Sequence, residues 1–222
     1  MLAAFDRDDP AGLVNLVGPM IAVSLMATGM VGAAMSARFR IGLSLALMSG
    51  GAMVAAVYAL GIAPISGPAS VLLALAVGSV SFAARGALFA RSAGARGWWI
   101  AGFIVGGEAA MLITAYVSPK ALPDWLIVLL PAQWTSIAVK TALLGIESRI
   151  SVAALAALGG TAAATLLVWW LWPRRWPYTV MFTTWLGFSA LVYHQPAPPL
   201  PPADQASSLH TAERVRANST RA

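Results

Sequence analysis

Seven long apolar runs constrain the fold of this chain more than any other feature. They occupy residues 11–35, 41–65, 69–90, 97–117, 124–146, 150–172 and 178–193. Six of them reach the roughly 20 residues that a helix needs to cross about 30 Å of hydrocarbon, and the seventh is shorter. None alternates as a strand does, and lipid accepts only helices or closed barrels. The sequence therefore predicts an all-α, multi-pass transmembrane bundle of six or seven spanning helices without a soluble domain.

The composition of the chain predicts that its surface contacts a lipid bilayer. Of 222 residues, 59% are hydrophobic and only 10% are charged, whereas soluble domains carry about 25% charged residues. The net charge of +6 comes from arginines scattered at the ends of the runs, so we expect no nucleic-acid partner. The excess of arginine over lysine and the abundance of alanine are typical of a GC-rich genome. We therefore expect a bacterial inner membrane protein.

Several kinds of chemistry lack the residues that they need. The chain has no cysteine, and its two histidines, His194 and His210, lie outside the apolar runs. This leaves no thiolate, no haem ligand pair and no histidine-rich metal site. Nucleophile-elbow and phosphate-loop motifs are absent from the sequence as well. We expect no catalytic residue, no metal and no cofactor. An intramembrane enzyme that uses a lone carboxylate as a general acid or base is a further alternative.

Three segments are predicted along the chain. Residues 1–10 form a short acidic segment, residues 11–193 form the transmembrane domain, and residues 194–222 form a proline-rich tail. The tail has no core-forming pattern, so we expect it to be extended and disordered.

Arginine and lysine near the ends of the runs predict the topology, because such residues favour the cytoplasmic side. They mark the first, third and fifth links, at Arg38, Arg40, Arg91, Arg96 and Arg149. These links are therefore predicted to be cytoplasmic, with a periplasmic amino terminus and, if all seven runs cross, a cytoplasmic tail. The sixth link carries Arg174 and Arg175 and contradicts this pattern. Either the last run does not cross, or another force holds this pair outside.

Aromatic residues beside arginines predict interfacial anchors. The stretch "VWWLWPRRWPY" combines Arg174 and Arg175 with four tryptophans, one of which is Trp176. Such side chains gather at the membrane–water boundary, where an anionic lipid or another anionic ligand is the alternative contact. Trp98, in "RGWW", is predicted to form a second anchor on the opposite face.

Small residues at four-residue spacing predict close helix packing. Gly102 and Gly106 lie one turn apart, and Gly160 lies in a similar small-residue face of the sixth run. Such faces let helix backbones approach closely. We expect packing inside the bundle, with a homo-oligomer seam or a contact to other membrane subunits as the alternative.

Glu108 stands alone as a carboxylate near the middle of an apolar run. A charge at this depth costs about 2.5–3.5 kcal/mol on insertion scales, so the group must take up a proton or pair with a cation. Arg85 and Lys140, in neighbouring runs, are the candidate cations. Gln133 follows a break at Pro131 and could line the same space.

Two functions remain open at this point. Glu108, Arg85, Lys140 and Gln133 could form the pathway of a small permease-like protein or transporter component that moves a solute or ion, proton-coupled through Glu108. Alternatively, Glu108 is a structural contact in a non-catalytic accessory or scaffold subunit of a larger membrane complex. A transporter predicts a polar, water-accessible cavity around these four residues, whereas a scaffold predicts a packed interior.

Overall fold

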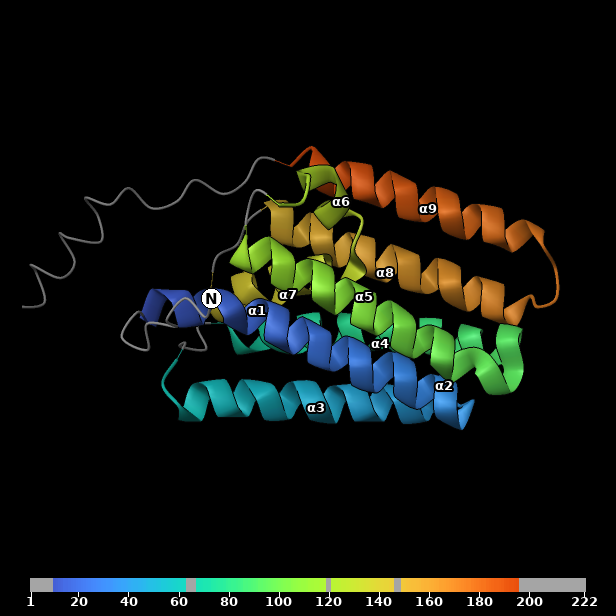
Figure 1. The fold of residues 1–222 in the computed structure, drawn as a ribbon, viewed down its shortest axis with the longest axis horizontal. Coiled ribbons are helices and arrows are strands. Elements are labelled where there is room, and N and C mark those ends of the chain that lie inside the picture. Colours follow the sequence, from blue (N-terminus) through green and yellow to red (C-terminus); the bar gives the residue numbers. More distant parts are fainter. Residues whose placement is uncertain (1–9, 63–66, 119–120, 146–148, 196–222) are drawn as a thin grey trace, which may run out of the picture.

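The computed structural model describes residues 10–62, 67–118, 121–145 and 149–195, and it describes side chains from residue 16 onward. Within these ranges the chain forms helices and turns and no strand, as Figure 1 shows. The helices are α1 (Pro10–Met26), η1 (Ala27–Val31), α2 (Gly32–Ser36), α3 (Phe39–Ala59), α4 (Pro68–Ala93), η2 (Gly94–Arg96), α5 (Gly97–Val117), α6 (Asp124–Val128), α7 (Pro131–Leu143), α8 (Arg149–Trp170) and α9 (Trp176–Tyr193).

Four helical segments among the described residues are long and apolar enough to cross a membrane. They are Leu16–Ser36, Phe39–Ala59, Pro68–Val117 and Arg149–Trp170. The third segment contains both α4 and α5, which fold back against each other at η2. The protein is thus an all-helical bundle with four candidate membrane segments, and length and composition alone do not confirm the expected six or seven spans.

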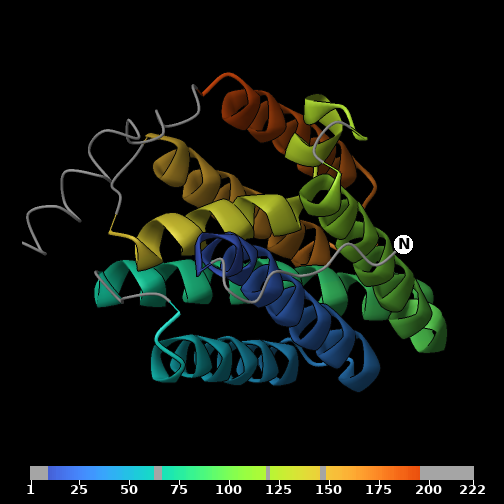
Figure 2. The same cartoon turned by 60° about the vertical axis from the view of Figure 1, so that its left-hand side comes forward.

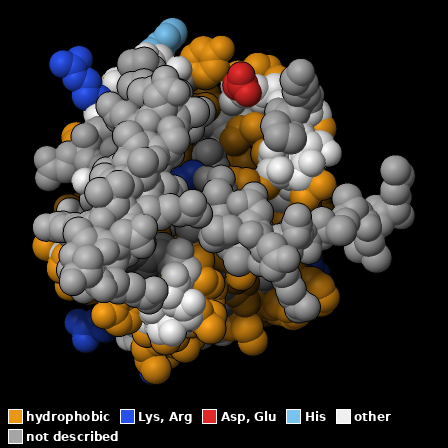
Figure 3. Space-filling view, turned by 90° about the vertical axis from the view of Figure 1, so that its left-hand side faces the viewer, with side chains coloured by type: hydrophobic (Ala, Val, Ile, Leu, Met, Phe, Trp, Pro, Cys, Tyr) orange, Lys and Arg blue, Asp and Glu red, His pale blue; other side chains and the backbone are white. Residues whose placement is uncertain are grey.

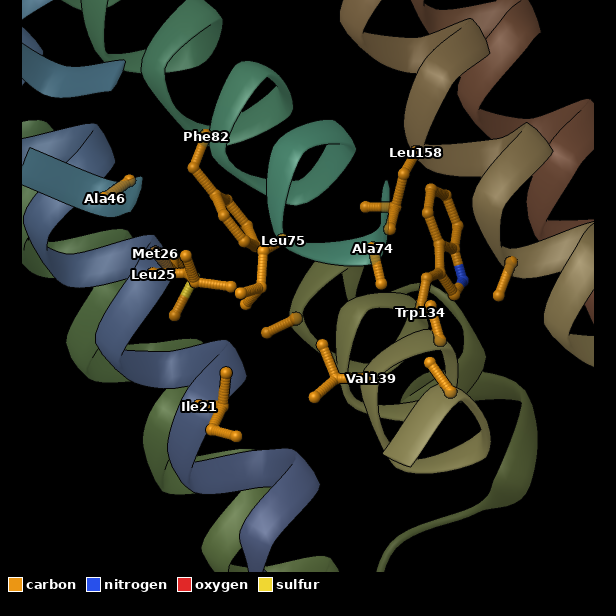
Figure 4. Close-up of a cluster of buried hydrophobic side chains, with 14 of the residues drawn as sticks. Ile21, Leu25, Met26, Ala46, Ala74, Leu75, Phe82, Trp134, Val139 and Leu158 are labelled. Carbon is orange, nitrogen blue, oxygen red and sulfur yellow. The ribbon is translucent and has the colours of Figure 1, made fainter. Parts of the chain in front are cut away.

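Helix α4 lies at the centre of the bundle and packs against α1, α3, α5, α7 and α8. Its apolar side chains meet those of the surrounding helices in one core, in which Phe82 and Leu75 face α1 and α3 while Ala74 faces α7 and α8 (Figure 4). Trp134, on α7, is fully buried in this core. Most side chains of α4 between Gly78 and Leu88 are buried by these neighbours, whereas Leu72 and Leu73 are exposed.

One close approach depends on a glycine in α4. Gly86 packs directly on the backbone of Met30, so that a Cβ at this position would lie 2.1 Å from the Met30 carbonyl oxygen. Met30 belongs to η1, a single π-helical segment that joins α1 to α2. Such π-bulges in a helix change the direction of the residues beyond them. The contact therefore holds the first apolar run against the half of α4 that carries Arg85.

The fifth apolar run forms a helical hairpin that returns to the end of the bundle from which it starts. Helix α6 begins beside the last turn of α9, and Leu129 then lies beside Trp185, near the middle of α9. Helix α7 begins beside Glu108, in the middle of α5, and ends beside Gly67, where α4 starts. Figures 1 and 2 show α6 and α7 in this arrangement.

Because the fifth run turns back, the link after α4 and the link after α8 lie at the same end of the bundle. Arg91, at the end of α4, lies over the Trp169 ring at 5.1 Å, so the ends of α4 and α8 are neighbours. The expectation of anchors on opposite faces is therefore not met, because α5 and α9, whose first turns contain Trp98 and Trp176, begin at the same end. Helix α9 ends toward the same end of the bundle at which α1 begins (Figure 1).

Arginines gather at the end of the bundle that carries these two links. The exposed arginines there are Arg38, Arg40, Arg91, Arg96, Arg174 and Arg175. Figure 3 views the other end, where hydrophobic side chains dominate the described surface and cations are scattered. Arg174 and Arg175 thus share their end with the first and third links. The acidic segment and nearly all of the proline-rich tail lie outside the described residues.

Candidate functional site: a cavity at Arg85 and Glu108

A cavity of about 490 Å³ lies between α5 and α9, with α4 and α8 at its base and the α6–α7 hairpin at one side. Most of its lining is apolar, with Phe89, Ile104 and Phe182 among the larger side chains. Arg85 and Glu108 also line it, on α4 and α5. Ligand pockets of about 300–1,000 Å³ with a few convergent polar groups are typical binding sites.

Glu108 binds the start of α7. Its Oε2 atom accepts a hydrogen bond of 3.1 Å from the backbone N–H of Ala132. This N–H belongs to the first turn of α7, where N–H groups lack partners within the helix. Pro131 stands at the first position of α7 and forces the break from α6. The carboxylate on α5 therefore caps the broken helix and also meets the positive end of its dipole.

Arg85 faces the same cavity from α4. Its Nη2 atom donates a hydrogen bond of 3.3 Å to the hydroxyl oxygen of Thr161, which itself donates to the Ala157 carbonyl at 2.7 Å. Its Nη1 atom is buried and has no hydrogen-bond partner in the described part of the chain. Arg85 and Glu108 thus line the same cavity, which contains a guanidinium, a carboxyl group and one unsatisfied donor.

Two tryptophans complete the hydrogen bonding of the hairpin. The break at Pro131 frees carbonyl groups of the preceding turn, and a freed carbonyl in an apolar interior needs a donor. The indole N–H of Trp134 donates to Val128 at 2.7 Å, and that of Trp185, on α9, donates to Leu129 at 3.2 Å. Sequence reasoning did not select Trp185 or Thr161, because neither residue lies in a motif near Glu108.

The structure separates the four residues that the sequence grouped into one pathway. Arg85 and Glu108 lie together, whereas Gln133 and Lys140 do not line this cavity. The side-chain oxygen of Gln133 is buried, and no hydrogen-bond donor among the described residues reaches it. Lys140 lies near the end of α7, beside Gly18 of α1. It is therefore about two turns of α7 away from Ala132, the residue that Glu108 contacts.

The predicted anchor residues lie on the surface. Arg174, Arg175 and Trp176 are exposed, and Trp98 stacks on the exposed Trp99 with ring centroids 4.2 Å apart. The two groups surround one end of the bundle, beside the arginines described above. This position suits a membrane–water boundary.

The three packing glycines differ in their surroundings. A Cβ on Gly160 would lie 2.1 Å from the Phe188 ring, so α8 and α9 approach closely there. Gly102 and Gly106, on α5, have no atom within 4 Å of such a Cβ, counting only neighbours that the structure describes. The expectation of packing inside the bundle therefore does not hold for Gly102 and Gly106, which lie on an outer face of α5.

Comparisons with known proteins gave no match: no protein-family model fits this sequence, and neither curated proteins nor solved structures match it. The site must therefore be interpreted from its own chemistry. Within the described residues, no group of three or more histidine, cysteine or acidic side chains could hold a metal ion. The cavity offers a guanidinium, a carboxylate, hydroxyl groups and a large apolar surface.

Proposed function

We propose that the protein is a small permease-like membrane protein or transporter component that moves a small solute or ion with Glu108 as the proton-coupling group. The observation that supports this most is the cavity, which both Arg85 and Glu108 line beside the break in the α6–α7 hairpin. Transporters commonly place their sites at such broken helices, near the middle of the bilayer. Arg85 and Glu108 are the pathway residues, while Lys140 and Gln133 lie apart from them.

We infer a topology for this function in a bacterial inner membrane. The first run, α3, α4, α5, α8 and α9 cross, while the α6–α7 hairpin enters and leaves on one side. The six exposed arginines then face the cytoplasm, as the positive-inside rule favours, whereas Arg149, at the start of α8, faces the periplasm. The amino terminus and the tail both face the periplasm. Arg174 and Arg175 need no special explanation in this arrangement.

Proton movement by liposomes that contain the protein tests the proposed function. We expect wild-type protein to move protons in a pH-dependent manner, and Glu108→Gln to abolish this movement, because the amide cannot exchange a proton. Asp124→Asn is the matched control, since Asp124 is an exposed carboxylate at the start of α6. Equal proton movement by wild type and Glu108→Gln would remove the coupling role of Glu108.

An accessory or scaffold subunit is the second candidate, and the outer face of α5 favours it. Gly102, Gly106 and Ala110 follow one another at four-residue spacing, and Gly102 and Gly106 are unpartnered by the described residues. Such a face suits a helix of a second copy or of another membrane subunit. Gly106→Leu should dissociate such a complex in mild detergent while leaving proton movement unchanged. An unchanged particle size would count against this candidate.

A further inference from the structure

We propose that the cavity at Arg85 binds a single-chain amphiphile with a terminal carboxylate, and that Glu108 takes up one proton when this ligand binds. The inference rests on the proposed function and names the substrate class of the same site. It is carried by three observations, namely the shape and lining of the cavity, the unsatisfied donor of Arg85, and the balance of charge.

The position of the cavity favours a ligand with an apolar body. Helices α5 and α9 do not pack along each other, and the cavity lies in the gap between them, above α4 and α8. In a bilayer this gap faces the acyl chains, so a molecule dissolved in the membrane can enter sideways. Leu88, Phe89, Met111 and Phe182 supply a surface that suits a hydrocarbon chain.

The donor groups favour a carboxylate as the polar end of the ligand. Arg85 Nη1 is buried without a partner, while Nη2 is bound to Thr161. An unsatisfied buried donor costs about 1–3 kcal/mol, and more when it is charged, so a ligand that satisfies it gains this free energy. A planar carboxylate is the natural partner of a guanidinium. A cationic ligand fits poorly, because Arg85 repels it and Glu108 is already bound to the Ala132 N–H.

Charge balance then requires a proton. Arg85 and Glu108 are the two ionisable side chains in the cavity lining, whereas the lining residues of η1, α6, α7, α8 and α9 are apolar or neutral. Tyr116, further along α5, hydrogen-bonds to Ser136 on α7. An anionic ligand would leave two negative charges beside one positive charge in an apolar surrounding, which is costly. Transfer of one proton from water to a Glu108 oxygen restores neutrality, and no other bond is made or broken.

The test measures binding and proton uptake together, with full-length protein in nanodiscs of zwitterionic lipid and empty nanodiscs as the blank. Dodecanoate is the probe, and dodecanol is the probe without the carboxylate. We expect saturable binding of dodecanoate with uptake of about one proton for each ligand bound, and weak binding of dodecanol. Glu108→Gln should bind dodecanoate without proton uptake, because its amide is neutral already.

Variants of Arg85 complete the test. Arg85→Gln should weaken dodecanoate binding by about tenfold to a hundredfold, while Arg96→Gln, an exposed arginine, should bind as wild type does. Because Arg85→Gln leaves Glu108 without its opposing charge, the neutral double variant R85Q/E108Q serves as a second variant if the first fails to fold. It too should bind weakly.

Three outcomes would overturn the proposal. The first is unchanged dodecanoate binding in both Arg85 variants, and the second is equal binding of dodecanol and dodecanoate. The third is binding of lysophosphatidic acid in place of dodecanoate, which would assign the site to a lipid phosphate. Failure of this proposal and failure of the proposed function are distinguishable. Proton movement in liposomes without dodecanoate binding would remove only the ligand assignment, and dodecanoate binding without proton movement would remove only the transport role.

Discussion

At the scale of single residues, Glu108 makes a structural contact and lies where the proposed proton-coupling role requires it, although the sequence presented these roles as alternatives. Its carboxylate caps α7 through the Ala132 N–H, which is a structural contact. It also lines a cavity beside Arg85, which is the position expected of a functional group. A charge near the middle of a membrane segment is tolerated when such partners surround it. The two roles can be separated because a cap needs only an oxygen acceptor, whereas proton coupling needs a group that titrates.

Stability measurements on Glu108 variants separate these roles. Glu108→Gln keeps a side-chain oxygen that can accept the Ala132 N–H, whereas Glu108→Ala removes it and leaves Arg85 without its opposing charge. Loss of a helix cap costs about 1 kcal/mol, and an uncompensated buried cation adds to this cost. Thermal unfolding in detergent should therefore rank the wild type first, Glu108→Gln second and Glu108→Ala last. Equal unfolding temperatures for the two variants would show that the contact contributes nothing.

At the scale of helices, the α6–α7 hairpin is held by groups that come from distant parts of the sequence. Glu108 comes from α5 and Trp185 from α9, while Trp134 belongs to α7 itself. Each satisfies a backbone group that the break at Pro131 leaves without a helical partner. The hairpin and the cavity are therefore parts of one arrangement, since Leu129, Leu130 and Pro131 also line the cavity.

Replacing Trp185 by phenylalanine tests how the hairpin is held. The substitution removes the indole N–H that donates to Leu129 while keeping an aromatic ring in place. We expect the free energy of unfolding to fall by about 1–3 kcal/mol, because the carbonyl is left unsatisfied in an apolar surrounding. Trp99→Phe is the matched control, since Trp99 is 65% exposed. An equal effect of both substitutions would mean that the hydrogen bond does not stabilise the hairpin.

At the scale of the whole molecule, the hairpin decides which side of the membrane each later segment faces in the proposed topology. A fifth run that crossed the bilayer would place Arg174 and Arg175 opposite Arg91 and Arg96. A run that returns places all four at one end, which is where the structure has them. One local break therefore reverses the direction of α8 and α9.

Single-cysteine labelling tests this topology directly, because the chain has no cysteine of its own. A membrane-impermeant thiol reagent should reach Ala95→Cys and Arg174→Cys from the same side of the membrane. It should reach Leu60→Cys and Ser118→Cys from the other side. All four positions are exposed. Labelling of Arg174→Cys together with Leu60→Cys would show that the fifth run crosses and would overturn the proposed topology.

Much of the fold could be predicted from the sequence, because a long apolar run has few alternatives. Its length and the need to satisfy backbone hydrogen bonds lead to helices, and the structure is all-helical over the described residues. Glu108 and Arg85 were selected because charged residues are rare in such runs. Neither selection required knowledge of how the helices pack.

The path of the fifth run and the composition of the site depended on tertiary structure. The local sequence of an apolar run with a proline in its middle does not show whether the run crosses the bilayer or turns back. The outcome depends on distant partners, here Glu108 and Trp185, that satisfy the broken backbone. The same turn moves Lys140 away from Glu108 and leaves Arg85 beside it. The sequence by itself thus determined the helices and the ionisable residues they carry, and packing decided which of these residues line the same cavity.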